Sequence, residues 1–278
     1  MLTPEEFHAS LVTELDQNPK HLPADQLYTL RRYYKNIVTQ TDKRPFYAYN
    51  WSRRVEPLFN ALQEMPTDGH MLDAGCGVGT ESFFAASVRS DIQISAVDFH
   101  DERLAAARIR VPEQKQITFK QANIFNELAE NHFDLVWTME ALSHIDPAEK
   151  FIADSFEALR PGGKLVVSDS HILNPKMMWR IFKIRRKASF QGYAFERELS
   201  TGEKITYANE RLFTTNQLGK ILKDAGFSHV DFQLSVFFPP SFAKVRPVFN
   251  LAVQGDKLAN QLPLLRQLGG IYTVSAQK

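Results

Sequence analysis

The sequence has little of what marks a secreted, thiol-rich or membrane-spanning protein. It contains one cysteine, Cys76, in 278 residues, so neither an internal disulfide nor a zinc site built from several thiolates can form. No stretch reaches the roughly 20 apolar residues of a membrane span, and the N-terminus lacks the pattern of a signal peptide. We therefore predict no resident metal, no export and a cytoplasmic location.

An excess of charge of one sign is also missing. Lys and Arg number 33 and Asp and Glu 32, which gives a formal net charge of +1. Nucleic-acid-binding proteins usually show a clear basic excess, so we expect no nucleic-acid partner. Hydrophobic residues make up 44% of the chain, which fits one large folded α/β domain with additions.

The first part of the chain is predicted to be helical. Thr3, Pro4 and Glu6 have the spacing of a capped helix start. Helical periodicity recurs in LYTLRRYYKNIV and in WSRRVEPLFNALQEM. We predict a helical N-terminal cap over residues 1–65, followed by the main domain over residues 66–278.

Short β-rich runs alternate with helical runs over residues 70–169. This alternation is typical of a mostly parallel sheet with crossover helices. The alternation resumes at TTNQLGKILKDAGF, where Thr214 is the expected helix cap and Gly226 the expected stop. We predict a helical lid inserted at about 170–213 and a second insertion at about 239–268.

A glycine-rich turn separates the first predicted strand from the next helix. In MLDAGCGVGT the glycines stand at positions 75, 77 and 79. Glycines let the backbone turn tightly and approach a ligand, and the helix start offers free N–H groups. A dinucleotide fingerprint would need a third glycine where Thr80 stands. The turn therefore predicts a nucleotide-like ligand other than NAD.

Four segments occur here in the order found in one enzyme family: MLDAGCGVGT, ISAVDFH, FDLVWTMEALSHI and LRPGGKLVVSD. Over roughly residues 68–238, and again at the last strand, the chain resembles the class I S-adenosylmethionine-dependent methyltransferases. The resemblance implies a Rossmann-like α/β fold with a seven-stranded, mostly parallel sheet whose last strand is antiparallel. It also implies S-adenosylmethionine as the cofactor.

The resemblance assigns cofactor contacts to individual residues. Asp73 and the backbone around Gly75 and Gly77 would hold the methionine part, and Asp98 would accept the ribose hydroxyls. Where the family usually has an acidic residue beside adenine, this sequence has Asn123, whose amide can both accept and donate. The other expected cofactor contacts are Cys76, Phe99 beside adenine, Ile124 and Met139.

The expected acceptor side of the site offers one candidate base. His144 follows the fourth strand, where a neutral imidazole can remove a proton from the acceptor; structural hydrogen bonding is the alternative. Methyl transfer depends mainly on alignment, so the chemistry does not require a base. Glu140 either orients a cationic substrate or caps a helix. Cys76 is interpreted as a packed residue rather than a nucleophile. The predicted substrate residues are Tyr33, Tyr34, Glu140, His144 and His171.

A basic amphipathic segment lies in the predicted lid. KMMWRIFKIRRKASF aligns cations on one helical face and apolar side chains on the adjacent one. The cations are Lys176, Arg180, Lys183 and Lys187, and the apolar residues are Met177, Ile181 and Ile184. Two interpretations stay open: a helix packed on the domain with a solvated charged face, or contact of residues 176–187 with an anionic or lipid-like substrate or a membrane surface.

We predict transfer of a methyl group to the oxygen, nitrogen or carbon of a small molecule, such as an anionic, lipid-like or natural-product precursor. The segment after the fourth strand reads MEALSHI, unlike the Asn/Asp-Pro-Pro-aromatic sequence that accompanies methylation of base or amide nitrogens in this superfamily. Two alternatives are RNA or protein methylation, and a cofactor-binding or membrane-docking protein without turnover.

Overall fold

The computed structural model of the chain describes residues 2–110, 116–186, 194–199, 202–208, 210–262 and 265–278. The N-terminal part is helical, as predicted. The hydroxyl of Thr3 accepts from the Glu6 backbone N–H, and the Glu6 carboxylate accepts from the Thr3 N–H, which forms the expected capping box. The elements are α1 (Pro4–Gln17), α2 (Ala24–Tyr33), α3 (Lys35–Thr39), η1 (Thr41–Lys43) and α4 (Arg44–Glu64).

Seven strands form one sheet in the order β3-β2-β1-β4-β5-β9-β8. The first five strands along the chain pair in parallel, whereas β9 is antiparallel to both of its neighbours. The predicted sheet, with its antiparallel last strand, is therefore confirmed. The strands are β1 (His70–Ala74), β2 (Gln93–Asp98), β3 (Ile117–Gln121), β4 (Phe133–Met139), β5 (Leu159–Ser170), β8 (Ser228–Ser235) and β9 (Ile271–Gln277).

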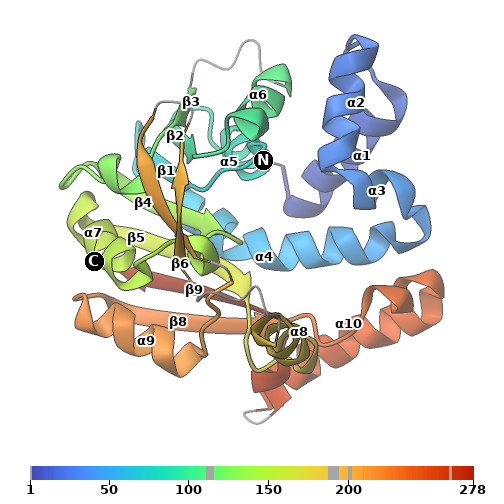
Figure 1. The fold of residues 1–278 in the computed structure, drawn as a ribbon. Helices are drawn as coiled ribbons and strands as arrows, with labels where there is room; N and C mark the ends of the chain where they lie inside the picture. Colours follow the sequence, from blue (N-terminus) through green and yellow to red (C-terminus); the bar gives the residue numbers. More distant parts are fainter. Residues whose placement is uncertain (1, 111–115, 187–193, 200–201, 209, 263–264) are drawn as a thin grey trace.

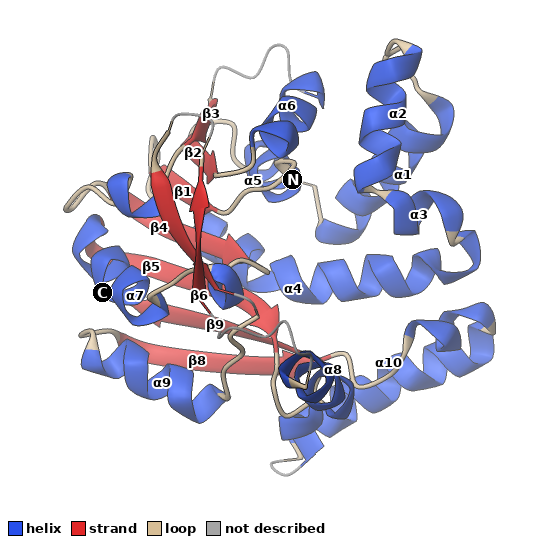
Figure 2. Ribbon diagram, in the orientation of Figure 1, coloured by secondary structure: helices blue, strands red, loops and turns tan. Residues whose placement is uncertain are grey.

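Helices cover both faces of this sheet (Figure 2). Leu135 and Trp137 on β4 pack in the cluster on the α4 and α5 side, and Val136 between them packs in the cluster on the α7 and α9 side. Both faces are buried, which explains the nearly continuous apolar runs of the parallel strands. The connecting elements are α5 (Thr80–Val88), α6 (Asp101–Arg110), η2 (Ile124–Asn126), η3 (Leu142–His144), α7 (Ala148–Ala158) and α9 (Thr215–Asp224).

The predicted lid contains a helix and also a small sheet. After β5 come α8 (Pro175–Arg185) and a two-stranded antiparallel hairpin of β6 (Ala194–Glu198) and β7 (Lys204–Ala208). The predicted lid helix is present, and the hairpin beside it was not predicted, because strands of five residues give only a short sequence pattern. The second insertion contains η4 (Pro240–Lys244), α10 (Arg246–Gln261) and η5 (Leu265–Leu268). Among the described helices, none combines the length and the apolar character needed to cross a bilayer.

Helix α4, the last helix of the predicted cap, packs into the main core. Val55, Leu58 and Leu62 are fully buried and join Leu135 and Trp137 in one cluster. Figure 1 shows α4 running beneath the rest of the cap and ending at the sheet. Helix α4 is therefore stabilised by packing on the sheet, although the predicted cap, which extends to residue 65, included it.

We expect Leu62→Ala to lower the free energy of unfolding of the whole domain by about 2–5 kcal/mol, the usual cost of a buried Leu-to-Ala change. Urea unfolding followed by circular dichroism measures this change. Gln63→Ala, on the exposed side of the same helix, is the control and should have little effect. A main transition that stays unchanged in Leu62→Ala would show that the cap folds independently.

Candidate functional site

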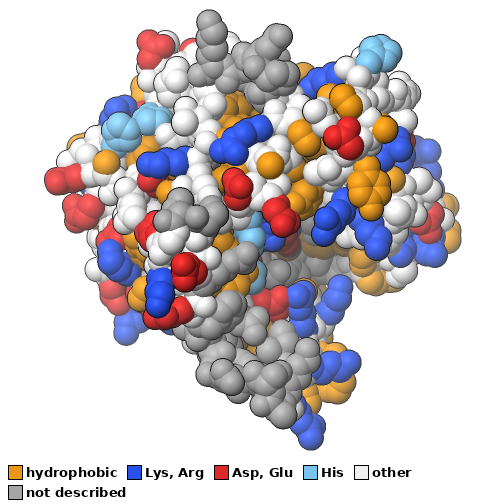
Figure 3. All heavy atoms as spheres, turned by 45° about the horizontal axis from the view of Figure 1, so that its top comes forward, with side chains coloured by type: hydrophobic (Ala, Val, Ile, Leu, Met, Phe, Trp, Pro, Cys, Tyr) orange, Lys and Arg blue, Asp and Glu red, His pale blue; other side chains and the backbone are white. Residues whose placement is uncertain are grey.

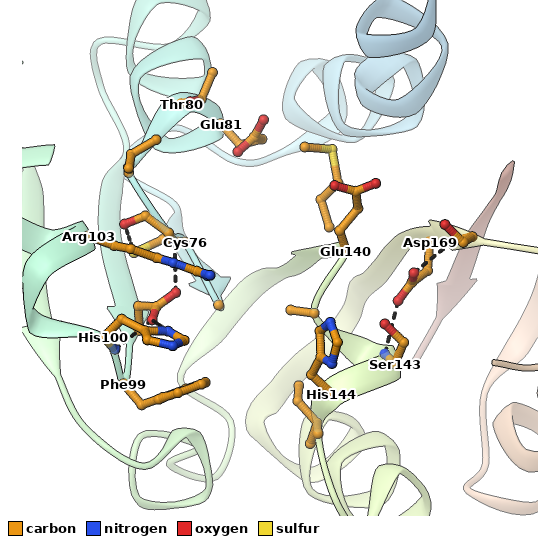
Figure 4. Close-up of a pocket in the computed structure, with 18 of the residues that line it drawn as sticks. Cys76, Thr80, Glu81, Phe99, His100, Arg103, Glu140, Ser143, His144 and Asp169 are labelled. Carbon is orange, nitrogen blue, oxygen red and sulfur yellow. Dashed lines mark hydrogen bonds and ion pairs between the residues drawn. The ribbon is translucent and has the colours of Figure 1, made fainter. Parts of the chain in front are cut away.

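A cavity of about 730 Å³ lies at the carboxyl ends of β1, β2 and β4. In open α/β sheets ligands bind outside the carboxyl ends of the strands, and small-molecule sites measure about 300–1,000 Å³. The cap contributes one wall through Tyr33, Tyr34 and Trp51, and the lid contributes another through Met177 and Tyr207. Figure 4 shows labelled side chains from several elements converging on this space.

Most of the predicted site residues line this cavity. Two do not: Asp73 and His171 are absent from its wall. Those that do are Tyr33, Tyr34, Gly75, Cys76, Gly77, Asp98, Phe99, Asn123, Ile124, Met139, Glu140 and His144.

The glycine turn is bound to β2 and faces open space. The N–H groups of Gly75 and Cys76 donate to the Val97 carbonyl at 2.8 and 3.0 Å. Gly75 has φ +82°, and a Cβ there would lie 2.5 Å from the Ala141 Cβ. Gly77 has φ +55°, and a Cβ there would meet nothing within 4 Å. Both positions favour glycine, and the space beside Gly77 fits close approach of a ligand.

Asp98 presents a buried carboxylate beside this turn. It is 4% exposed and accepts from the Gly77 N–H at 2.9 Å and from the His100 N–H at 2.7 Å. Burial raises its pKa, but the hydrogen bonds from His100 and Gly77 outweigh burial and lower the pKa overall. An ionised carboxylate with further lone pairs fits the two hydroxyls of a ribose.

Aromatic and amide groups form the neighbouring wall. The Phe99 ring meets the Tyr207 ring edge to face, with centroids 5.2 Å apart. The Asn123 side-chain oxygen accepts from the Phe125 N–H at 3.2 Å, so its amide NH₂ is the part left to donate toward a ligand. A flat aromatic wall beside an amide donor fits an adenine ring.

Asp73 lies behind the turn. Its carboxylate is 2% exposed and accepts from the Ser82 hydroxyl on α5 at 2.5 Å. Burial, reinforced by the nearby Glu81, raises the pKa of Asp73 to about 8. Asp73 therefore binds α5 beside the turn, and its direct contact with the cofactor stays a prediction.

Cys76 faces the cavity as a protonated thiol. Burial, with the nearby Asp73 carboxyl, raises its pKa well above the ordinary value. Because the thiolate is the nucleophile, this shift supports the interpretation of Cys76 as a packed residue.

His144 lies in η3, directly after β4, and its ring is held on two sides. Its Nδ1 lies 3.0 Å from the Ala208 carbonyl oxygen, so Nδ1 carries the proton and Nε2 carries the lone pair of a neutral ring. The Tyr207 ring stacks on it at 5.0 Å and 6°. In Figure 4 the His144 ring lies between His100 and Asp169.

Glu140 has an unusual backbone for a residue other than glycine, with φ +50°. Its carboxylate forms an ion pair with the buried Arg54 of α4 at 3.0 Å. Neither orientation of a cationic substrate nor helix capping, the two interpretations of Glu140, predicted this pair. It links the end of β4 to the cap. Left-handed backbone outside glycine often occurs at functional sites.

His171 is fully buried against β9, where its ring meets Tyr272 edge to face at 6.3 Å. Its backbone N–H donates to the Gly270 carbonyl at 3.2 Å. His171 therefore lies outside the cavity wall, and its role in substrate binding stays a prediction.

Several carboxylates of the site were missed in the sequence. Asp169, at the end of β5, is buried and accepts from the Ser143 and Ser170 N–H groups at 3.0 and 2.6 Å; burial raises its pKa. Glu81 accepts from the Trp51 indole at 2.9 Å, and burial raises its pKa as well. The position of Asp169 at a strand end was a usable signal, whereas nothing in the sequence singled out Glu81.

Comparison with known proteins agrees with this geometry. The family model described as "Methyltransferase domain" matches residues 72–167. The chain is 27% identical over 162 residues to phosphoethanolamine N-methyltransferase 1 of Triticum aestivum, covering 58% of this chain and 28% of that protein. It is 31% identical over 166 residues to the ubiquinone biosynthesis O-methyltransferase of Psychrobacter arcticus, covering 58% of this chain and 60% of that one.

A solved structure shows the same fold. Phosphoethanolamine N-methyltransferase 2 of Haemonchus contortus, in complex with phosphomonomethylethanolamine and S-adenosylhomocysteine, superposes with a TM-score of 0.56 at 21% identity, over 82% of this chain and 52% of that one. The family match assigns residues 72–167 to a methyltransferase domain, and the solved structure shows that the chain has the fold of an S-adenosylmethionine-dependent methyltransferase. The resemblance predicted from the sequence, and its cofactor, are confirmed. The chain spans less than a third of the wheat relative's length.

We expect Asp98→Asn to weaken S-adenosylmethionine binding at least about tenfold, because it removes a charged acceptor for the ribose hydroxyls. Isothermal titration calorimetry measures the affinity, and circular dichroism checks the fold. Asp101→Asn, an exposed change at the start of α6, is the control. Equal affinities for wild type and Asp98→Asn would refute the ribose assignment.

The raised pKa of Asp73 predicts that the free energy of unfolding depends on pH. Its folded pKa of about 8 lies above the ordinary 3.8, so the folded state holds its proton from about pH 4 to about pH 8 while the unfolded chain loses it. This group therefore lowers the free energy of unfolding as pH rises through that window.

Asp73→Asn removes this titration. Relative to wild type, the variant should gain on the order of a few kcal/mol of stability on going from pH 5 to pH 8. Urea unfolding at the two pH values measures the difference. The raised pKa of Asp73 would be contradicted if the variant and wild type differed in free energy of unfolding by the same amount at both pH values.

Proposed function

We propose that the protein transfers the methyl group of S-adenosylmethionine to a small-molecule acceptor. The observation that carries this proposal is that one cavity joins the glycine turn and Asp98 to His144 and the lid residue Arg180. Methyl transfer needs donor and acceptor in line and close together, and a shared cavity meets that requirement.

Residues already described would hold the cofactor. Gly75 and Gly77 would allow the methionine part to approach the backbone, Asp98 would accept the ribose hydroxyls, and Phe99 and Asn123 would border adenine. The bound cofactor supplies an electrophilic methyl group on a sulfonium that leaves readily. The protein then has to place the acceptor and keep water away.

A small acceptor is favoured over a macromolecule. Cap and lid both contribute walls to the cavity, so the acceptor end is enclosed by segments on two sides. The face drawn in Figure 3 mixes Lys and Arg with Asp and Glu over much of its area. RNA recognition depends on a continuous basic surface, which that face does not display.

His144 is proposed to accept the acceptor's proton when the acceptor is a hydroxyl or an amine. The hydrogen bond from Nδ1 to the Ala208 carbonyl fixes the tautomer that leaves Nε2 basic. Tyr207 stacked on the ring holds its orientation. The hairpin that carries Tyr207 and Ala208 thus positions the proposed base.

The proposal is tested in two steps on the intact chain. Calorimetry with S-adenosylmethionine establishes binding, and mass spectrometry then follows S-adenosylhomocysteine release across pools of hydroxyl, amine and carbon-acid acceptors. Binding without release in any pool would favour the alternative of a cofactor-binding protein without turnover. Release that depends on RNA or protein would favour macromolecular methylation.

For an acceptor found in this way, we expect His144→Gln to lower kcat about 10²-fold or more, because a general base contributes on that order. His132→Gln, an exposed histidine outside the cavity wall, is the control. An unchanged kcat in His144→Gln would assign His144 a structural role.

A further inference from the structure

Helix α8 presents an exposed surface of aromatic and basic side chains. Trp179 is 58% exposed and Phe182 is 47% exposed, and their rings stack with centroids 5.6 Å apart. Lys183 lies over the Trp179 ring at 5.1 Å, and Arg186 lies over the Phe182 ring at 5.2 Å. Adjacent exposed aromatic rings of this size mark a contact surface. Lys187 and the side chain of Ile184 lie outside the described residues.

Helix α10 adds a second exposed apolar stripe. Val248, Leu251, Leu258 and Leu262 follow one another at helical spacing, and Leu251 is 69% exposed. The other side of the helix already packs on the protein, where Phe249 joins the cluster around Phe238. A surface helix normally has one apolar stripe facing the core. The second stripe on α10 therefore calls for a partner.

The two helices lie at the same end of the molecule. Asn174, the residue before α8, donates its side-chain N–H to the Leu268 carbonyl of η5 at 3.0 Å. Figure 1 shows α8 and α10 together at the lower end of the view. We call this the α8–α10 surface; it comprises Trp179, Phe182, Lys183, Arg186, Val248, Leu251, Leu258 and Leu262.

The charge of these segments differs from that of the whole chain. Residues 175–186 contain five Lys and Arg and no acid, and residues 240–268 contain four Lys and Arg and one acid. That acid, Asp256, is buried and accepts from the Tyr49 hydroxyl at 2.6 Å. The net charge of the whole chain is only +1, so the basic excess is concentrated here.

We propose that the α8–α10 surface docks on an anionic lipid bilayer. Aromatic and aliphatic side chains enter the interface while Lys and Arg meet the acidic headgroups. A second copy of the chain fits this surface less well, because a symmetric pair would bring the same cations face to face. Met177 and Arg180 of α8 line the cavity, so the docked helix also forms a wall of the site.

Co-sedimentation of the full chain with vesicles tests the proposal. We expect binding to phosphatidylcholine vesicles that contain about one third phosphatidylglycerol, little binding to phosphatidylcholine alone, and weaker binding as salt rises. Lys183→Glu and Arg186→Glu should each lower the partition coefficient about fivefold or more. Trp179→Ala combined with Phe182→Ala should lower it in low and high salt alike.

The N-terminal cap offers matched controls. Arg32→Glu reverses an exposed charge on α2, and Tyr28→Ala removes an aromatic side chain that is 72% exposed; neither should alter vesicle binding. Retained S-adenosylmethionine affinity shows that each variant is folded. The proposal would be overturned if the protein did not bind anionic vesicles, or if surface and control variants lost binding equally. Self-association through this surface without vesicle binding would overturn it as well. The proposed methyl transfer is assayed without lipid, so failure of the membrane proposal and failure of the proposed function can be told apart.

Discussion

The attachment of the glycine turn to the end of β2 is the constraint on which the site depends. The Val97 carbonyl accepts from the turn at Gly75 and Cys76, and the Asp98 carboxylate accepts from Gly77. Parallel pairing of β1 with β2 brings these groups into register. The same carboxylate that orders the turn is the one we propose for the ribose hydroxyls, so the proposed binding links the geometry of the turn to the affinity of the site through one side chain.

The cap is held over this turn by a buried polar network. Arg110 of α6 donates to the Tyr34 hydroxyl at 3.0 Å and pairs with Glu14 of α1 at 3.3 Å. The Tyr34 hydroxyl also lies 2.6 Å from the Thr80 hydroxyl at the start of α5. Such a network costs desolvation and is stable only when its members are paired. It therefore fixes one position of the cap relative to the helix that begins at the turn.

The positions of strand ends could be predicted from the sequence, but the directions of the side chains at those ends could not. Asp98 was found because an acidic residue closes a β-rich run at the expected distance from the turn. The hydrogen bond of Asp73 was not predicted, because it is formed with Ser82 of α5, a separate element. Tyr207 was missed because its strand belongs to a short hairpin with mixed polarity. Local pattern thus predicts the edge of the sheet, whereas the contacts of a side chain depend on elements distant in the sequence.

Tyr207 lies against two rings of the cavity wall, Phe99 directly after β2 and His144 in η3, while its strand bridges to Ile145. A molecule bound between these walls would lie against the hairpin. Because one ring touches both neighbouring walls, a change in the packing of Tyr207 would alter the shape of the site on two sides at once.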